Sequence, residues 1–248
     1  KLEDLSEAER KKILQRSGQD VEEILPKVRE IVEEVKERGT EALLEFTEEF
    51  DGVKIDQDQL RVSDREFSQA YKKVDDEDIE AINSAAESIE RYHREQNPDE
   101  WMKEFDSGIE AGQIVRPLNS IGAYAPGGKA QYPTTVLMAI IPAKIAGVKD
   151  TTVCTPPNSN GEINPATLVA ADIAEADEVY KLGGATAIAA MAEGTGKITA
   201  AEKIVGPGNI YVSAAKEIVS TEVDIDFMAG PTEVLILADS TADPRFIA

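Results

Sequence analysis

Three short glycine–proline segments hold the residues best suited to binding a ligand. They lie at 124–128 (Tyr-Ala-Pro-Gly-Gly), 206–209 (Gly-Pro-Gly-Asn) and 229–233 (Ala-Gly-Pro-Thr-Glu). Each follows a short apolar or β-branched run, where glycine lets the backbone turn sharply and approach a ligand without a Cβ in the way. If the segments join strands to helices, they bring helix N-termini and free amides to one sheet edge, where an anion such as a pyrophosphate would bind. The alternative is that the glycines serve only to turn the chain.

Two polar side chains in these segments could contact such a ligand. Tyr124 offers an aromatic face and a hydroxyl suited to a ribose or a nicotinamide, or it fills the core with its hydroxyl in water. Asn209 can donate and accept with one amide, or it caps the helix expected over 210–219. The G-x-G-x-x-G fingerprint is absent, and 194–196 matches only its first half, so an ordinary Rossmann phosphate loop is not predicted.

Four other side chains are of types that could have a functional role. Cys154, the single cysteine, could capture an aldehyde, but it lacks a basic neighbour in sequence, which favours a buried and inert thiol. His93, the single histidine, lies among charged residues and is expected to be a solvated helix residue. Lys129 suits a phosphate contact and a solvated loop equally well. Glu233 is expected to form an ion pair rather than to take part in catalysis.

From Gly112 onward, short apolar strands alternate with helices of small residues. We expect strands over 121–125, 151–155, 179–182 and 203–205, and helices over 134–146, 185–192 and 210–219. Asn164 and Pro165 should open one more helix, and two more strands are expected at 227–228 and 234–237. Such alternation predicts parallel pairing through right-handed crossovers, with ligands at the carboxyl ends of the strands.

The first fifty residues are predicted to form two helices. Asp20 and Glu23 have the spacing of a capping box ahead of a run with helical apolar period, and Pro26 either opens or kinks that helix. Gly39 is expected to end it, and Thr40 is expected to cap the next helix.

The following fifty residues are predicted to be helical after two short strands. The strands are expected over 53–55 and 60–62. Ser63 and Glu66 form a second capping box. The acidic run 75–78 should start the next helix, where carboxylates favour the positive end of the helix dipole.

The composition indicates a globular protein that binds neither nucleic acid nor a membrane. The chain has 248 residues, of which 42% are apolar, so it can bury a large core in one or two domains. Its net charge of −22 repels phosphate backbones. The longest apolar run, 136–141, is broken by Pro142 and is shorter than a membrane span. A single cysteine fits a reducing compartment and no signal peptide is visible, so we expect a cytoplasmic protein.

With 182–186 (Leu-Gly-Gly-Ala-Thr) and 203–209 (Lys-Ile-Val-Gly-Pro-Gly-Asn), the three glycine–proline segments make the chain resemble the histidinol dehydrogenase family. The resemblance covers almost the whole chain. It implies an α/β fold of two domains with parallel, incomplete Rossmann-like sheets flanked by helices, plus an N-terminal helical arm. The implied divisions are a helical and α/β domain at 1–122, an NAD-binding domain at 123–228, and a segment at 229–248 that returns to the first domain.

The resemblance also implies a reaction and a set of contacts. The whole protein would oxidise L-histidinol through L-histidinal to L-histidine in histidine biosynthesis, as a homodimer that uses NAD and zinc. The family's NAD contacts fall on Tyr124, Thr186 and Asn209, and a substrate contact falls on Thr232. Thr186 stands where the commoner family pattern has glutamine, so its shorter side chain would reach the cofactor only through a water molecule.

The same resemblance places the family's zinc ligands and its catalytic Glu-His pair after the segment with which this chain ends. We therefore expect no catalytic residue and no zinc ligand among these residues. On this interpretation the chain binds NAD weakly and does not oxidise histidinol by itself. One alternative is a non-catalytic NAD-binding or assembly module derived from the same fold. Another is a different dehydrogenase that uses Cys154 as its nucleophile.

Overall fold

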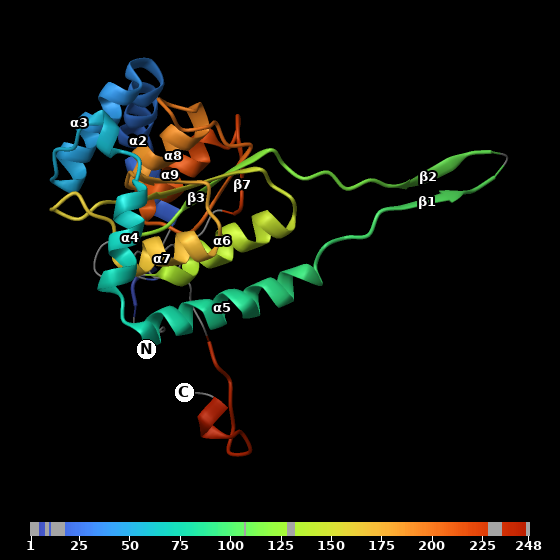
Figure 1. The fold of residues 1–248 in the computed structure, drawn as a ribbon. Coiled ribbons are helices and arrows are strands. Elements are labelled where there is room, and N and C mark those ends of the chain that lie inside the picture. Colours follow the sequence, from blue (N-terminus) through green and yellow to red (C-terminus); the bar gives the residue numbers. More distant parts are fainter. Residues whose placement is uncertain are drawn as a thin grey trace.

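The computed structural model describes residues 5–7, 10, 18–106, 108–127, 132–227 and 235–246. Its centre is a five-stranded parallel sheet in the order β5-β4-β3-β6-β7 (Figure 1). The strands are β3 (Ser120–Tyr124), β4 (Asp150–Thr155), β5 (Glu178–Lys181), β6 (Lys203–Val205) and β7 (Asp224–Ile225). From β3 the chain winds outward through β4 to β5, then returns to the other side of β3 for β6 and β7. The winding direction therefore reverses between β3 and β6, which is where open α/β sheets bind ligands.

Both faces of the sheet are buried, as is usual for parallel strands with apolar sequences. Side chains alternate between the two faces along each strand. One face carries Tyr124, Cys154, Tyr180 and Ile204. The opposite face carries Ile121, Ala123, Val153 and Val179. Two separate hydrophobic cores form as a result.

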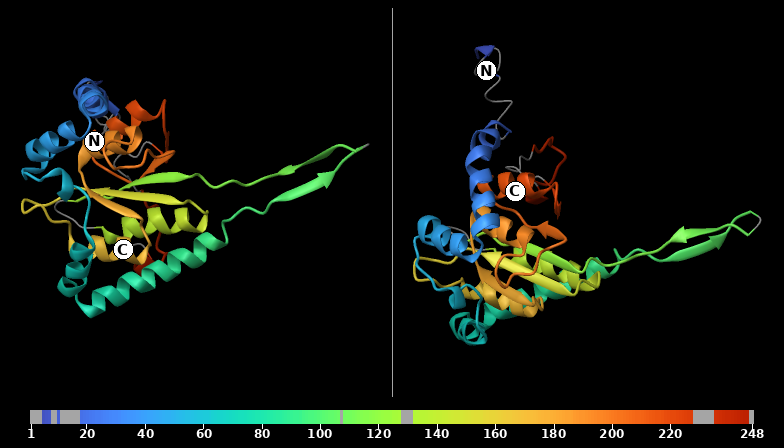
Figure 2. Two further views of the ribbon diagram at one scale, coloured as in Figure 1. Left: turned by 45° about the horizontal axis from the view of Figure 1, so that its top comes forward. Right: turned by 90° about the horizontal axis from the view of Figure 1, so that it is seen from above.

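Helices cover both faces of the sheet. The first core includes residues of α2 (Gly18–Arg38), α3 (Thr40–Asp51), α8 (Gly184–Glu193) and α9 (Ile210–Val219). The second includes residues of α4 (Asp64–Lys73), α5 (Asp76–Arg94), α6 (Pro133–Ile145) and α7 (Pro165–Ile173). Of the N-terminal helices, α2 packs on α8 and α9, and α5 packs on α6 and α7. Figure 2 shows this arrangement from two further directions. Because the N-terminal helices pack on helices from later in the chain, each core contains residues that are far apart in the sequence.

Local sequence signals located most of these elements correctly. The helix predicted over 210–219 is α9, and β3 to β6 lie within a residue of their predicted ranges. Asn164 caps α7, because its side chain accepts a hydrogen bond from the backbone N of Thr167 at 3.2 Å. Ser63 and Glu66 form the predicted capping box at the start of α4. These predictions are therefore confirmed.

The strands predicted over 53–55 and 60–62 are wrong. Residues between them form a 3-10 helix, η2 (Gln57–Gln59), and Arg61 makes only an isolated antiparallel bridge with Tyr180. The apolar residues of this stretch are buried as a strand's would be. However, η2 turns the chain between them, so the stretch touches the edge of β5 without forming a ladder.

Two helix starts also differ from the prediction. α2 begins at Gly18, so Asp20 lies inside its first turn rather than before it. Pro26 lies inside the helix. Thr40 is the first residue of α3, and Gly39, with a φ of 60°, occupies the cap position without a side-chain cap. A glycine adopts a positive φ at little cost, so Gly39 can make the turn between the two helices, and α3 starts one residue earlier than a threonine cap would allow.

The described residues confirm the expected α/β class with a parallel sheet flanked by helices, and one of the two implied parallel sheets is seen among them. Phe227 lies beyond β7, and residues 235–237 form no strand, with each side chain more than half exposed. An apolar segment becomes a strand only by pairing with another strand, and no described strand pairs with this one. Positions 228 and 234 of the two predicted strands lie outside the described residues. The domain boundaries at 122 and 228 stay predictions.

A two-stranded antiparallel hairpin, β1 (Trp101–Glu104) with β2 (Glu110–Gln113), projects from the body of the molecule in Figure 1. All the residues of both strands are exposed. The sequence analysis missed this hairpin because charged residues interrupt the alternation that identifies a half-buried strand. Near the other end of the chain, η3 (Pro244–Phe246) is a single 3-10 turn.

Candidate functional site

A cleft of about 760 Å³ opens at the carboxyl ends of the strands. Its walls come from the loops after β3, β4, β5 and β6, together with the end of α3. The cleft therefore lies where the winding of the sheet reverses, and it has the size of a typical small-molecule site. Two of the sequence-predicted residues, Tyr124 and Asn209, both line it, although they come from separate loops.

Tyr124 is the last residue of β3, and only 4% of its surface is exposed. Its ring belongs to the first hydrophobic core. Its hydroxyl oxygen accepts a hydrogen bond from the backbone N of Gly184 at 3.2 Å, which leaves the hydroxyl proton to be donated. Burial, together with the nearby Asp51 carboxylate, raises the pKa of Tyr124 to about 12. The phenol therefore stays neutral. The core-filling interpretation is confirmed, and the ligand contact stays a prediction for a residue that also lines the cleft.

Asn209 caps α9, as one of its two interpretations predicted. Its Oδ1 accepts hydrogen bonds from the backbone N of Tyr211 at 3.0 Å and of Val212 at 3.1 Å. These bonds use the oxygen of the amide and hold the side chain in one orientation. The Nδ2 group is a donor that the cap does not use, so capping and ligand contact are compatible in the same residue.

Thr186 is the third residue of α8 and is 3% exposed. The residues of that helix which line the cleft are its neighbours Gly184 and Ala185. Thr232 lies outside the described residues, as do Lys129 and Glu233. The structure therefore brings Tyr124 and Asn209 to one cleft, whereas Thr186 is buried in α8 and does not line it. The binding roles of all four candidates stay predictions.

Three helices begin at the cleft. Asn164 and Asn209, the caps of α7 and α9, line it, and so do Gly183 and Gly184 at the start of α8. The start of α8 has no side-chain cap; its Gly184 amide donates to the Tyr124 hydroxyl, and the amides of Ala185 and Thr186 are left as donors for an anion. Of the three glycine–proline segments, only 206–209 is described as leading into one of these three helices, so the predicted anion site stays a prediction.

The contribution of α3 to the cleft was not predicted from the sequence. Phe50 and Asp51, the last two residues of that helix, line the cleft opposite the glycine loops. A Cβ on Gly183 would lie 2.9 Å from Oδ1 of Asp51 and 2.8 Å from Cβ of Pro156, so only glycine fits there. Burial raises the pKa of Asp51 to about 6. Burial is the one cause of this shift, and no described cation offsets it.

One local signal pointed to Asp51. An acidic residue at the last position of a helix is repelled by the negative end of the helix dipole, which is unfavourable. Residues that break a local rule in this way are expected at functional sites. The signal is weak by itself, because nothing in the sequence shows that the end of α3 meets the loop after β5.

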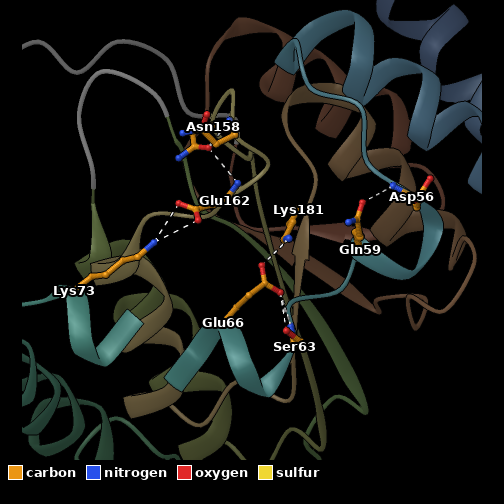
Figure 3. A network of polar contacts seen from close by, with 9 residues as sticks. Asp56, Gln59, Ser63, Glu66, Lys73, Asn158, Glu162 and Lys181 are labelled. Atoms are coloured by element: carbon orange, nitrogen blue, oxygen red, sulfur yellow. Dashed lines mark hydrogen bonds and ion pairs between the residues drawn. The ribbon is translucent and has the colours of Figure 1, made fainter. Parts of the chain in front are cut away.

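The loop after β4, one wall of the cleft, carries part of the polar contacts drawn in Figure 3, those of Lys73, Asn158 and Glu162. Oδ1 of Asn158 accepts a hydrogen bond from the backbone N of Glu162 at 3.1 Å, which closes a tight turn. Lys73 of α4 pairs with the Glu162 carboxylate at 3.3 Å. Both Asn158 and Glu162 line the cleft. The N-terminal half of the chain therefore supports this wall as well as contributing α3.

The remaining reactive residues lie elsewhere. Cys154 is fully buried, as predicted, and burial raises the pKa of its thiol, which disfavours an attacking thiolate. His93 is partly buried on α5, edge-on to the Tyr92 ring at 5.3 Å between centroids. Among the residues that the structure describes, no three His, Cys, Asp or Glu side chains are grouped as metal ligands would be.

Comparison with known proteins identifies similar chains. A family model described as histidinol dehydrogenase matches residues 14–248. The histidinol dehydrogenase of Methanothermobacter thermautotrophicus is 51% identical over 95% of this chain and 55% of its own length. That of Archaeoglobus fulgidus is 51% identical over 94% of this chain and 57% of its own length. The crystal structure of histidinol dehydrogenase from Elizabethkingia anophelis superposes with a TM-score of 0.86, at 43% identity, over 90% of this chain and 52% of that one. The chain thus spans little more than half of the relatives it matches.

Proposed function

Because the chain belongs to the histidinol dehydrogenase family, a family of oxidoreductases, we propose that its cleft is the NAD site of a protein that oxidises L-histidinol through L-histidinal to L-histidine. The observation that carries the proposal is the meeting of Tyr124 and Asn209 in one cleft at the point where the sheet reverses its winding. The volume of about 760 Å³ and the N-terminus of α8, which has no side-chain cap, fit a ligand with anionic phosphates.

The residues of the cleft have distinct parts in this proposal. NAD, when bound, supplies the acceptor for the hydride that leaves the substrate. Asn209 donates from Nδ2, and Tyr124 donates its hydroxyl proton to a polar group of the cofactor. The Ala185 and Thr186 amides of α8 bind the pyrophosphate. The Thr186 hydroxyl is short, so it reaches the cofactor only through an intervening water.

The other features of the whole protein are proposed on family membership alone. They are histidinol as substrate, a substrate contact from Thr232, a homodimer, bound zinc and a place in the cytoplasm. The described residues do not fit a zinc site, because they hold no grouped set of ligands, and no step is derived through the metal. Within the described ranges no helix is long and apolar enough to cross a membrane.

The test is calorimetric titration of NAD into this chain and its variants at position 209. Asn209→Ala removes both the cap and the amide donor, and we expect NAD affinity to fall by about fivefold or more. Asn209→Asp keeps a good cap but replaces the donor with a carboxylate, so we expect the same loss of affinity with little loss of stability. The matched control is Ser63→Ala, which removes a helix cap away from the cleft.

Each outcome of this titration is informative. Saturable binding that both Asn209 variants weaken, and that Ser63→Ala leaves unchanged, supports the proposal. No saturable binding by the folded, unmodified chain would contradict it, as would full affinity in Asn209→Asp. In a parallel assay of NADH formation with histidinol and Zn²⁺, we expect no turnover by this chain, and steady turnover would overturn that expectation.

A further inference from the structure

A buried ion pair holds both sides of one glycine in the loop that leads to Asn209. The backbone N of Gly206 donates to Oδ2 of Asp226 at 2.9 Å. The Nζ of Lys216 donates to the carbonyl oxygen of Gly206 at 2.6 Å and to Oδ1 of Asp226 at 2.5 Å. The Lys216 side chain is 3% exposed and that of Asp226 is 20% exposed. The three groups therefore form a closed set of charge-assisted hydrogen bonds around a single residue.

Two glycines of the same loop, Gly206 and Gly208, lie in close contact with neighbouring residues. Gly206 has a φ of 112°, and a Cβ there would lie 2.1 Å from the backbone oxygen of Tyr124. A Cβ on Gly208 would lie 2.4 Å from the side chain of Val212. Two glycines in four residues would otherwise give the loop many backbone conformations. The contacts and the ion pair together select one of them.

The ion pair connects three segments of the chain: the loop after β6, helix α9 and the residue after β7. Lys216 lies in the second half of α9, the helix whose first turn Asn209 caps. Asp226 follows β7 directly. Gly206 follows β6. The pair therefore ties the β6–α9 loop to the helix after it and to the neighbouring strand, so that Asn209 and Tyr124 keep their separation across the cleft.

Stability alone is a poor explanation for this pair. Moving two charges out of water costs several kcal/mol, and apolar replacements of similar volume are often neutral or stabilising. What the pair supplies that an apolar pair cannot is directional bonds to both the N–H and the carbonyl of Gly206. Apolar side chains could fill the same space, but they would leave the two polar groups of the loop without these partners.

We propose that Lys216 and Asp226 are positioning residues for the cofactor site, acting through the loop 206–209 to hold Asn209 in its binding orientation. The inference rests on the proposed function, because the ligand is NAD. It adds that the affinity for NAD depends on two side chains that do not line the cleft.

The experiment is a double-mutant cycle on NAD binding by this chain. Lys216→Met keeps most of the side-chain volume and removes the donor, and it should weaken NAD binding by about five- to tenfold. If Lys216 acts through Asn209, then Asn209→Ala should cost much less affinity in the Lys216→Met background than in the unmodified chain. Asp226→Asn is the milder second variant, should Lys216→Met fail to fold; it leaves one acceptor oxygen where Gly206 N–H and Lys216 Nζ need two, so one of these hydrogen bonds is lost. Additive effects of the two substitutions would overturn the proposal.

The matched control is Lys144→Met. Lys144 pairs with Asp177 at 2.7 Å, and that pair lies at the opposite edge of the sheet, where Asp177 also accepts from Thr151 at the start of β4. Its loss should lower stability without changing the affinity for NAD. A fall in affinity equal to that of Lys216→Met would show that any lost ion pair disturbs the site, and the positioning role would be wrong.

Amide hydrogen exchange over 206–212 gives a readout that needs no ligand. Lys216→Met should speed exchange at the Tyr211 and Val212 amides, which Asn209 caps, and Lys144→Met should not. If the unmodified chain binds no NAD, the proposed function is contradicted. The hydrogen-exchange rates then still test whether Lys216 positions Asn209. Unchanged exchange in Lys216→Met would refute the inference even if NAD binds.

Discussion

Replacing Asp51 by asparagine should stabilise the protein, and should do so more at high pH than at low pH. Asp51 ends α3, where the helix dipole disfavours a negative charge. Its carboxyl lies against Gly183 in the cleft wall, and burial raises its pKa from 3.8 to about 6. Asparagine has almost the same shape and no charge to desolvate, so the substitution isolates the electrostatic effect.

The size and sign follow from the shift in pKa. A rise of about two units corresponds to about 3 kcal/mol, and partial exposure of the carboxyl lowers this to about 1–2 kcal/mol. The folded state binds more protons than the unfolded state between pH 3.8 and about 6, so the free energy of unfolding falls as the pH rises through this window. The cost of the charge is complete above that window and absent below it.

Urea unfolding at pH 8 and pH 5 provides the assay. At pH 8 the Asp51→Asn variant should gain the full 1–2 kcal/mol, and at pH 5 about three quarters of that gain should remain. Both values lie above the sequence pI of about 4.4, which limits precipitation. The control is Glu49→Gln, an exposed carboxylate of the same helix that also lines the cleft. A gain in Asp51→Asn that is equal at the two pH values, or a loss, would refute the reasoning.

Two further predictions concern the wall and the core of the site. Gly183→Ala should lower stability by about 1–3 kcal/mol and weaken NAD binding, because the new Cβ meets Pro156 and Asp51; unfolding and titration curves like those of the unmodified chain would show that the wall yields instead. Cys154 should react with a thiol reagent only as fast as the chain opens, because it is fully buried; immediate labelling of the folded protein would restore the case for a nucleophilic thiol.

Predictions from the sequence were correct where residues close together in the chain determine the local structure. Asn209 caps α9 through amides two and three residues ahead, so its role could be predicted from a short segment. The same holds for Asn164 on α7 and for the capping box of Ser63 and Glu66. Strands β3 to β6 were also found from local patterns, since buried parallel strands are short continuous apolar runs.

Predictions failed where the outcome depends on a distant partner. Residues 53–55 and 60–62 have the composition of strands, but η2 separates them and β5 is met at only one bridge. The exposed segment 235–237 is similarly strand-like in sequence and has no described strand beside it. A strand exists only as one side of a ladder, so a single segment cannot settle its own structure.

By itself, then, the sequence determined the alternation of strands and helices, the glycine loops at the carboxyl ends of the strands, and the family to which they belong. Only the tertiary structure decided that Tyr124 and Asn209 share one cleft, that Asp51 of α3 closes it, and that Lys216 and Asp226 meet around Gly206. The physical reason is the range of the interactions. Caps and turns are formed by neighbours along the chain, whereas a cleft, a desolvated carboxylate and a buried ion pair exist only after separate elements have packed together.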